Sequence, residues 1–130
     1  MSEWYWKNGK KVISETTPIG SKKWTSGMMM IEEKLHDWKY RCVGRTRLWW
    51  GGRVSTVWIG LDMSWSFAKK HKPLFFETMV FKNGSFSELD MERYSTEDEA
   101  KLGHQQMVLR WSNPFFLLKE LIYKVLHKYN

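Results

Sequence analysis

Two long stretches rich in aromatic, β-branched and basic residues flank the pair Gly51-Gly52. Residues 39–50 precede the pair and residues 53–63 follow it. Glycine adopts positive φ angles without steric cost, and a two-residue connection of this kind favours the primed turns of β-hairpins. The pattern therefore predicts an antiparallel hairpin at the centre of the chain, around which the other elements must be arranged.

Two further strands are expected after this hairpin. Residues 74–81 are rich in aromatic and branched side chains, and Lys82-Asn83-Gly84-Ser85 has the composition of a turn. A shorter and more polar strand is expected at residues 86–94. Sequential strands joined by tight turns are typical of an antiparallel meander.

The N-terminal third of the chain predicts smaller elements. Trp4-Tyr5-Trp6 and residues 11–14 flank Lys7-Asn8-Gly9-Lys10, which indicates a short hairpin with a primed Asn-Gly turn. Residues 28–37 suit either a short helix or a strand, because an apolar run of this length does not distinguish the two.

Two helices are expected at the C-terminal end. Thr96 with Glu99 three residues later is typical of a helix N-terminus, and Asn113-Pro114 supplies an N-cap followed by a residue suited to the first helical position. The second helix is amphipathic: its apolar residues recur at spacings of three and four, and its basic residues occupy the other face. The apolar set is Phe115, Leu118, Leu121, Ile122, Val125, Leu126 and Tyr129, and the basic set is Lys119, Lys124, His127 and Lys128.

The chain is expected to form one α+β domain over residues 1–130: an antiparallel β-meander of about four strands followed by two helices, with a short N-terminal hairpin. With 42% hydrophobic residues in 130, it has enough apolar material for a core. Cys42 is the only cysteine, so no internal disulfide or cysteine-based zinc site forms. No apolar run has the length of a membrane span and the N-terminus lacks a signal-peptide core, so a cytoplasmic location and no membrane partner are expected.

The turn at Gly51-Gly52 also predicts a strand register. If these two residues alone form the loop, Trp50 faces Arg53, Arg45 faces Trp58 and Arg41 faces Asp62. One sheet face then carries three arginines and two tryptophans, namely Arg41, Arg45, Arg47, Trp49 and Trp58. Guanidinium groups bind phosphate and indole rings stack on bases, so this face is a candidate ligand-binding surface. Arg–Trp pairs also stabilise sheets and interfaces without any ligand, and that alternative stays open.

The net charge of +7 favours the same class of partner, namely nucleic acid or a nucleotide-like ligand. Lys69, Lys70 and Lys72, in the loop between the second and third strands, are candidates for auxiliary phosphate contacts, although such a run is also common in a solvated loop.

Catalytic motifs are absent from the sequence: it contains no phosphate-binding P-loop, dinucleotide-binding glycine motif, zinc-protease motif or nucleophile elbow. Its four histidines lack metal-ligand spacing, so no metal or cofactor is expected. The best acid–base candidates are Asp62, Glu77 and His104, which form a site only if the fold brings them into one pocket. Structural pairing of these three groups is the preferred interpretation, and the chain is expected not to be an enzyme.

Three blocks follow one another between residues 54 and 108. Residues 54–62 read Val-Ser-Thr-Val-Trp-Ile-Gly-Leu-Asp, residues 73–81 read Pro-Leu-Phe-Phe-Glu-Thr-Met-Val-Phe, and residues 93–100 read Arg-Tyr-Ser-Thr-Glu-Asp-Glu-Ala, with Gly103-His104 after them. Their order resembles a group of small proteins encoded by bacteriophages and prophages. In that group a histidine often follows Gly-Leu-Asp, where this chain has Met63, which argues against histidine-dependent catalysis.

The resemblance implies a biological context, and no reaction. Small phage accessory proteins act by binding: they inhibit host defence enzymes, sequester nucleotide signals or assist virion assembly. The expected function is therefore a non-enzymatic accessory protein that binds an anionic partner through the basic-aromatic face, with counter-defence as one role. The alternative is a protein–protein interaction or assembly module that uses its aromatic surface and C-terminal helix to form a homo-oligomer or to bind a host protein.

Overall fold

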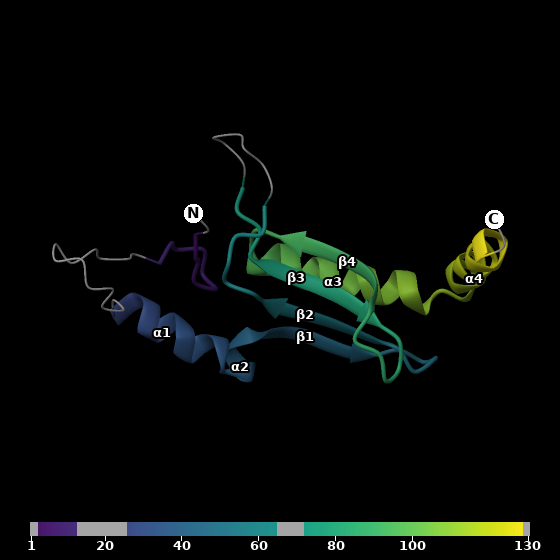
Figure 1. The fold of residues 1–130 in the computed structure, drawn as a ribbon, viewed down its shortest axis with the longest axis horizontal. Helices are drawn as coiled ribbons and strands as arrows, with labels where there is room; N and C mark the ends of the chain where they lie inside the picture. The colour runs from purple at the N-terminus through teal and green to yellow at the C-terminus, as the bar shows by residue number, and fades with distance from the viewer. Residues whose placement is uncertain (1–2, 13–25, 65–71, 129–130) are drawn as a thin grey trace.

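The computed structural model describes residues 3–12, 26–64 and 72–128, and its sheet confirms the expected α+β meander (Figure 1). The four strands are antiparallel and follow one another in chain order across the sheet. They are β1 (Cys42–Arg47), β2 (Arg53–Trp58), β3 (Phe76–Phe81) and β4 (Glu88–Tyr94). Ser85 N–H donates to the carbonyl of Lys82 (3.2 Å) in the expected turn between β3 and β4, where Gly84 has a φ of 72°.

Helices precede and follow the sheet. α1 (Ser26–Leu35) and α2 (Trp38–Arg41) lie before it, so the ambiguous region at residues 28–37 is mainly helical. α3 (Glu97–Ser112) packs against all four strands on one face of the sheet, whereas α4 (Pro114–Lys128) approaches α3 alone among the described elements. Figure 1 shows α4 beyond the C-terminal end of α3, away from the strands.

The central hairpin is shorter than the sequence pattern suggests. Residues expected to begin its first strand form α2, because the carboxylate of Asp37 caps that helix by accepting from the backbone N–H groups of Lys39 (3.1 Å) and Tyr40 (3.3 Å). The second strand ends at Trp58, and Gly60, with a φ of 76°, redirects the chain after it.

The loop of the hairpin contains three residues, Trp49, Trp50 and Gly51, so the prediction of a two-residue primed turn is wrong. Gly51 N–H donates to the carbonyl of Leu48 (3.0 Å), and Leu48 N–H donates to that of Gly52 (2.7 Å). Gly51 has a φ of 96°, whereas Gly52 does not adopt positive φ, which a type I′ turn requires at both central positions. A turn closed by one left-handed glycine is the usual three-residue hairpin connection.

Both tryptophans of the loop are bound to the end of α3. The Nε1–H of Trp49 donates to the carbonyl of Ser112 (3.0 Å), and the Nε1–H of Trp50 donates to that of Trp111 (2.8 Å). The last carbonyls of a helix have no partner within the helix, so the two indole groups satisfy acceptors that need one. These contacts hold Trp49 and Trp50 in a turn, although their side chains suit a strand.

The three-residue loop changes the predicted register. Arg47 lies opposite Arg53 and Arg45 opposite Ser55, so the predicted pairs Trp50–Arg53, Arg45–Trp58 and Arg41–Asp62 are wrong. A shift by an odd number of positions inverts the side-chain alternation of one strand relative to the other. Trp58 is consequently fully buried in the core.

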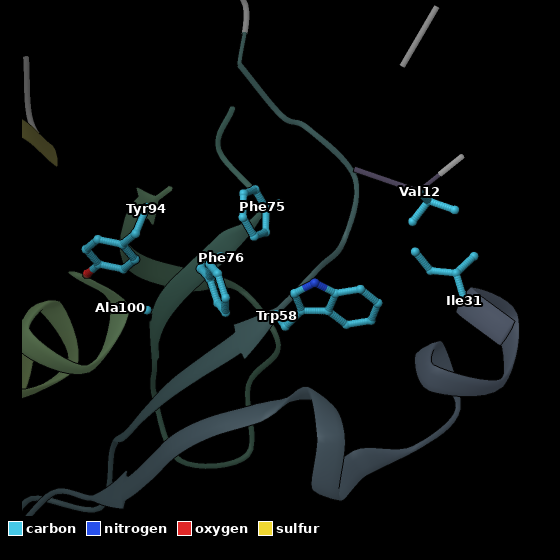
Figure 2. Close-up of a cluster of buried hydrophobic side chains, with 7 residues drawn as sticks. All are labelled: Val12, Ile31, Trp58, Phe75, Phe76, Tyr94 and Ala100. Carbon is cyan, nitrogen blue, oxygen red and sulfur yellow. The ribbon is translucent and has the colours of Figure 1, made fainter. Parts of the chain in front are cut away.

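The core has two neighbouring clusters of buried side chains. In the first, Trp58 points toward Val12 and Ile31, and Phe76 lies beside Trp58 (Figure 2). Its members are Val12, Ile31, Trp58, Phe75, Phe76, Tyr94 and Ala100. The second cluster, nearer the C-terminal end of α3, contains Leu48, Val54, Val80, Met107 and Trp111.

The expected N-terminal hairpin is present in its described part. Tyr5 pairs with Lys11 and Trp4 pairs with Leu61, so the hairpin joins the segment after β2. Gly9 has positive φ but Asn8 does not, so this turn is not of the predicted type I′ either. Residues 13 and 14 lie outside the described residues.

The predicted helix starts are confirmed. The Oγ1 of Thr96 accepts from Glu99 N–H (3.1 Å), and the Oδ1 of Asn113 accepts from Phe115 N–H (2.9 Å). α4 begins at Pro114, as predicted, and continues to Lys128, the last described residue; Tyr129 lies outside the described residues. None of the side chains of α4 is fully buried.

Candidate anion-binding site

The sheet has one face under α3 and one face that no described helix covers. Side chains alternate along each strand, so Thr46, Val54 and Thr56 point toward α3, while the neighbouring residues point to the open face. Arg45 and Arg47 of β1 and Arg53 of β2 therefore share the open face, at the end of the hairpin nearest its loop.

Arg47 and Arg53 form a like-charged cross-strand pair. They are direct partners in the ladder, and Arg45 is the next residue of β1 on the same face. The side chains of Arg45 and Arg47 are exposed, and neither forms an ion pair with a described carboxylate. Like charges in direct cross-strand positions destabilise a sheet, so this corner of the molecule attracts an anion.

Arg53 is held in place from the neighbouring turn. Its Nη2 donates to the carbonyl of Ser85 (3.0 Å) and its Nη1 to that of Lys82 (3.4 Å). Its guanidinium carbon lies 4.7 Å from the ring centroid of Phe81 and 5.8 Å from that of Phe86. Carbonyl groups and ring faces orient a guanidinium without neutralising it, so Arg53 keeps its full charge at a fixed position.

A hollow of about 470 Å³ lies among these groups. Arg45, Arg47, Gly51, Arg53 and Asn83 line it. Asn83, from the β3–β4 turn, adds an amide that donates and accepts hydrogen bonds. Three guanidinium groups and one amide around an open hollow match the planar, multidentate recognition of phosphate oxygens.

Phe86 lies beside Arg53, one of the residues that line this hollow. Its side chain is 90% exposed and lies near the guanidinium of Arg53. Exposing a phenyl ring to water costs free energy. Exposed aromatic rings beside basic side chains are used by nucleic-acid-binding proteins to stack on bases. We call Arg45, Arg47, Arg53, Asn83 and Phe86 the arginine site.

The predicted basic-aromatic face is brought together only in part. Arg45 and Arg47 meet in the arginine site, but Trp58 is in the core, and Trp49, 68% exposed, is bound to Ser112 on the other side of the loop. Arg41 is the last residue of α2, before the far end of β1, and its Nε donates to the carbonyl of Trp58 (3.5 Å). Lys72 is exposed, and Lys69 and Lys70 lie outside the described residues.

Sequence reasoning missed three members of the arginine site, Arg53, Asn83 and Phe86. Arg53 was expected opposite Trp50, and only the longer loop places it beside Arg47. Phe86 was expected to begin a strand, but β4 begins at Glu88. The only sequence signal for Asn83 and Phe86 was their position at the β3–β4 turn, which has no chemical specificity.

Asp62, Glu77 and His104 do not converge. Glu77 lies on the open face, where its carboxylate binds Arg93 (Nε–Oε2 2.9 Å). His104 lies on the opposite side of the sheet, under α3, and Asp62 accepts from the backbone N–H groups of Ser64 and Leu74, both at 2.9 Å. The proposed acid–base trio therefore has no common pocket.

His104 instead joins a chain of hydroxyl groups between α3 and the sheet. Its Nε2 lies 2.8 Å from the Oγ1 of Thr46 and its Nδ1 lies 2.7 Å from that of Thr56, which in turn lies 2.5 Å from the Oγ1 of Thr78. Burial disfavours the charged imidazolium and lowers the pKa of His104 below 6.5. A neutral ring with both nitrogens bound to hydroxyl groups fits a structural role.

Among the described residues, no three side chains of metal-ligating type are grouped so as to hold a metal ion. None of the described helices has the length and apolar character needed to cross a membrane.

No protein-family model matches the chain, and comparisons with curated proteins and with solved structures give no match either. The arginine site therefore rests on its own geometry and charge.

Proposed function

We propose that this chain is a non-enzymatic binding protein that takes a phosphate-bearing anion, either nucleic acid or a nucleotide-like signal molecule, in the arginine site. The observation that carries the proposal is the direct pairing of Arg47 with Arg53 beside Arg45, without a described carboxylate to compensate them. Phosphate is the common biological anion that arginines bind in this number and arrangement.

The dimensions of the site suit a small ligand such as a nucleotide unit. Its volume of about 470 Å³ lies within the range of small-molecule sites, roughly 300–1,000 Å³. Phosphate would contact Arg45 and Arg47, and a base would stack on the exposed ring of Phe86 beside Arg53. The hollow is open to solvent, so a nucleotide within a longer strand fits the same arrangement.

The biological setting that we propose comes from the resemblance of residues 54–108 to small phage-encoded proteins. It supports an accessory protein that acts inside the host cell, with counter-defence as its role. Binding of a nucleotide signal and binding of nucleic acid both fit that setting.

Fluorescence anisotropy at low salt tests the proposal, with a labelled single-stranded oligonucleotide in one arm and a labelled mononucleotide or cyclic dinucleotide in the other. Replacing Arg45 and Arg47 together by Ala should lower the affinity for the preferred ligand by at least about tenfold, since each phosphate contact is charge-assisted. The matched control is Lys119→Ala with Lys124→Ala on α4, which removes the same charge away from the site. Unchanged affinity in the arginine variant, or an equal loss in the control, would exclude the arginine site.

A second candidate function is protein–protein assembly through α4. One observation favours it: seven apolar side chains of this helix are half or more exposed to solvent. A contiguous apolar surface of this kind marks an interaction site more often than a free surface.

A further inference from the structure

The apolar stripe of α4 has no partner within the described chain. Leu118, Leu121, Ile122 and Val125 follow one side of the helix at spacings of three and four residues, and each is half or more exposed. A solvent-exposed amphipathic helix normally buries such a stripe against the body of the protein. Here the stripe faces away from it.

A different side of α4 contacts the body. Phe116 and Leu117, in the first turn, pack against the second core cluster, and the ring of Phe116 meets that of Trp111 edge-on at 5.1 Å between centroids. With about 3.6 residues per turn, these two side chains project on the side of the helix away from the centre of the Leu118–Val125 stripe. The contact that attaches α4 therefore turns its stripe outward.

The connection between α3 and α4 prevents the stripe from folding back along its own α3. Asn113 is the only residue between Ser112, which ends α3, and Pro114, which begins α4. Antiparallel helix pairs need a loop of about two to five residues to reverse the chain. In addition, proline at the first helical position fixes the start of α4. The stripe therefore cannot be covered by α3 of its own chain.

The outer side of α3 offers a matching surface. Leu102 is 56% exposed and Leu109 is 72% exposed, and both lie opposite the side on which Ala100, Gly103 and Met107 are buried against the sheet. These leucines are seven residues apart, as are Leu118 and Val125 of α4. Equal spacing of this kind allows two helices to pair along a common seam.

The charges of the two helices fit an antiparallel pairing. The first turn of α3 contains Glu97, Asp98 and Glu99, and the last turn of α4 contains His127 and Lys128. When α4 runs antiparallel to α3, its basic end meets this acidic end. A parallel pairing would place the basic turn of α4 beside Arg110, at the C-terminal end of α3.

We propose that two copies of this chain form a symmetric dimer in which α4 of each copy packs antiparallel on the outer face of α3 of the other. Leu118 lies opposite Leu109 of the second copy, Val125 opposite Leu102, and Lys128 beside Glu99 and Asp98. In this register Asn113 of one copy lies opposite Pro114 of the other, so the two connections meet at the twofold axis. The position of α4 beyond the end of α3 fits this exchange (Figure 1).

Sedimentation velocity and light scattering over a range of protein concentrations test the dimer. The wild-type chain should have twice the chain mass, and Leu118→Asp with Val125→Asp should raise the dissociation constant by at least about tenfold, because central apolar contacts dominate such interfaces. Leu102→Asp with Leu109→Asp should have the same effect. All four side chains are half or more exposed in the single chain, so these changes leave its core intact. Met29→Asp with Met30→Asp, on exposed residues of α1, is the matched control and should remain dimeric.

Two further measurements identify the surfaces that meet. Asp98→Lys should weaken the dimer and Lys128→Asp should restore it in the same chain. After Cys42→Ser removes the native thiol, Leu109→Cys with Leu118→Cys should form intermolecular disulfides on mild oxidation. Three results would each contradict the proposed dimer. The chain could be a monomer at every concentration, or its dimer could survive the changes on α3. It could also be a monomer that binds anionic vesicles through α4. Arg45→Ala with Arg47→Ala should remain dimeric, so the two proposals fail separately.

Discussion

Arg47, at the end of β1, lies directly opposite Arg53, at the start of β2, next to the hairpin loop. Two guanidinium groups in direct cross-strand positions repel each other, and an anion between them relieves that repulsion. If the arginine site binds an anion, as we propose, its occupancy will stabilise this corner of the sheet.

Replacing Arg47 by Thr should stabilise the unliganded protein. The change removes one member of the like-charged pair and introduces a residue well suited to strands, so we expect the free energy of unfolding to rise by about 0.2–1 kcal/mol. Urea denaturation at low salt measures it. Arg45→Thr, opposite Ser55, is the control and should give a smaller gain. A loss of stability in Arg47→Thr, or an equal gain in the control, would show that the repulsion is unimportant.

Affinity for a single-stranded oligonucleotide should fall steeply with salt. Each phosphate contact releases condensed counterions, and removing one contact lowers the slope of log K against log salt concentration by roughly 0.7 for a single strand. We expect Arg45→Ala to lower the slope by about this amount. Anisotropy titrations at several salt concentrations measure it, with Lys119→Ala as the control. A slope that stays the same in Arg45→Ala would mean that Arg45 does not contact phosphate.

Stability should decrease as the pH falls below about 6.5. Burial lowers the pKa of His104 in the folded state, so between that lowered pKa and 6.5 the unfolded chain binds a proton that the folded chain does not. The free energy of unfolding is highest above 6.5 and declines with decreasing pH until the folded-state pKa is reached. Urea midpoints measured across this range should show the decline in the wild type and lose much of it in His104→Gln.

The control for this pH dependence is His36→Gln, at an exposed position between α1 and α2. It should keep the decline of the wild type. If both variants keep it, another group titrates and His104 is not responsible.

Asp90 should contribute to stability through Trp111 more than through Arg110. Its Oδ2 accepts from the Nε1–H of the buried Trp111 (2.9 Å) and binds the half-exposed Arg110 (3.0 Å). Asp90→Ala leaves the indole N–H without this acceptor, at a cost of about 1–3 kcal/mol in the free energy of unfolding. Asp90→Asn keeps an acceptor and should lose less than half as much. Equal losses in thermal or urea unfolding would instead assign the stabilisation to the ion pair.

The order of the elements was predictable from local chemistry. Gly84 and the residues around it specify a turn, and Thr96 and Asn113 specify helix starts through side-chain hydrogen bonds made within a few residues. Such signals are contained in the sequence window that forms the element, so they hold without knowledge of the rest of the fold.

The candidate site was predictable only in part because it depends on register. Trp49 and Trp50 have the composition of a strand, but their indole N–H groups bind carbonyls of α3, more than 60 residues away in the chain. That long-range contact makes the loop one residue longer and moves Trp58 from the expected binding face to the core. Arg53, expected beside Trp50, joins Arg45 and Arg47 for the same reason.

The loop that carries these two tryptophans has a thermodynamic consequence. Gly51 lines the arginine site, while Trp49 and Trp50 hold the last turn of α3, directly before the Asn113 connection. An anion in the hollow would thus contact one end of the segment formed by this loop and the last turn of α3, and a second copy on α4 would contact the other end. If anion binding shifts the position of this segment, it will change the free energy of self-association. By reciprocal linkage, self-association will then change the free energy of anion binding by the same amount.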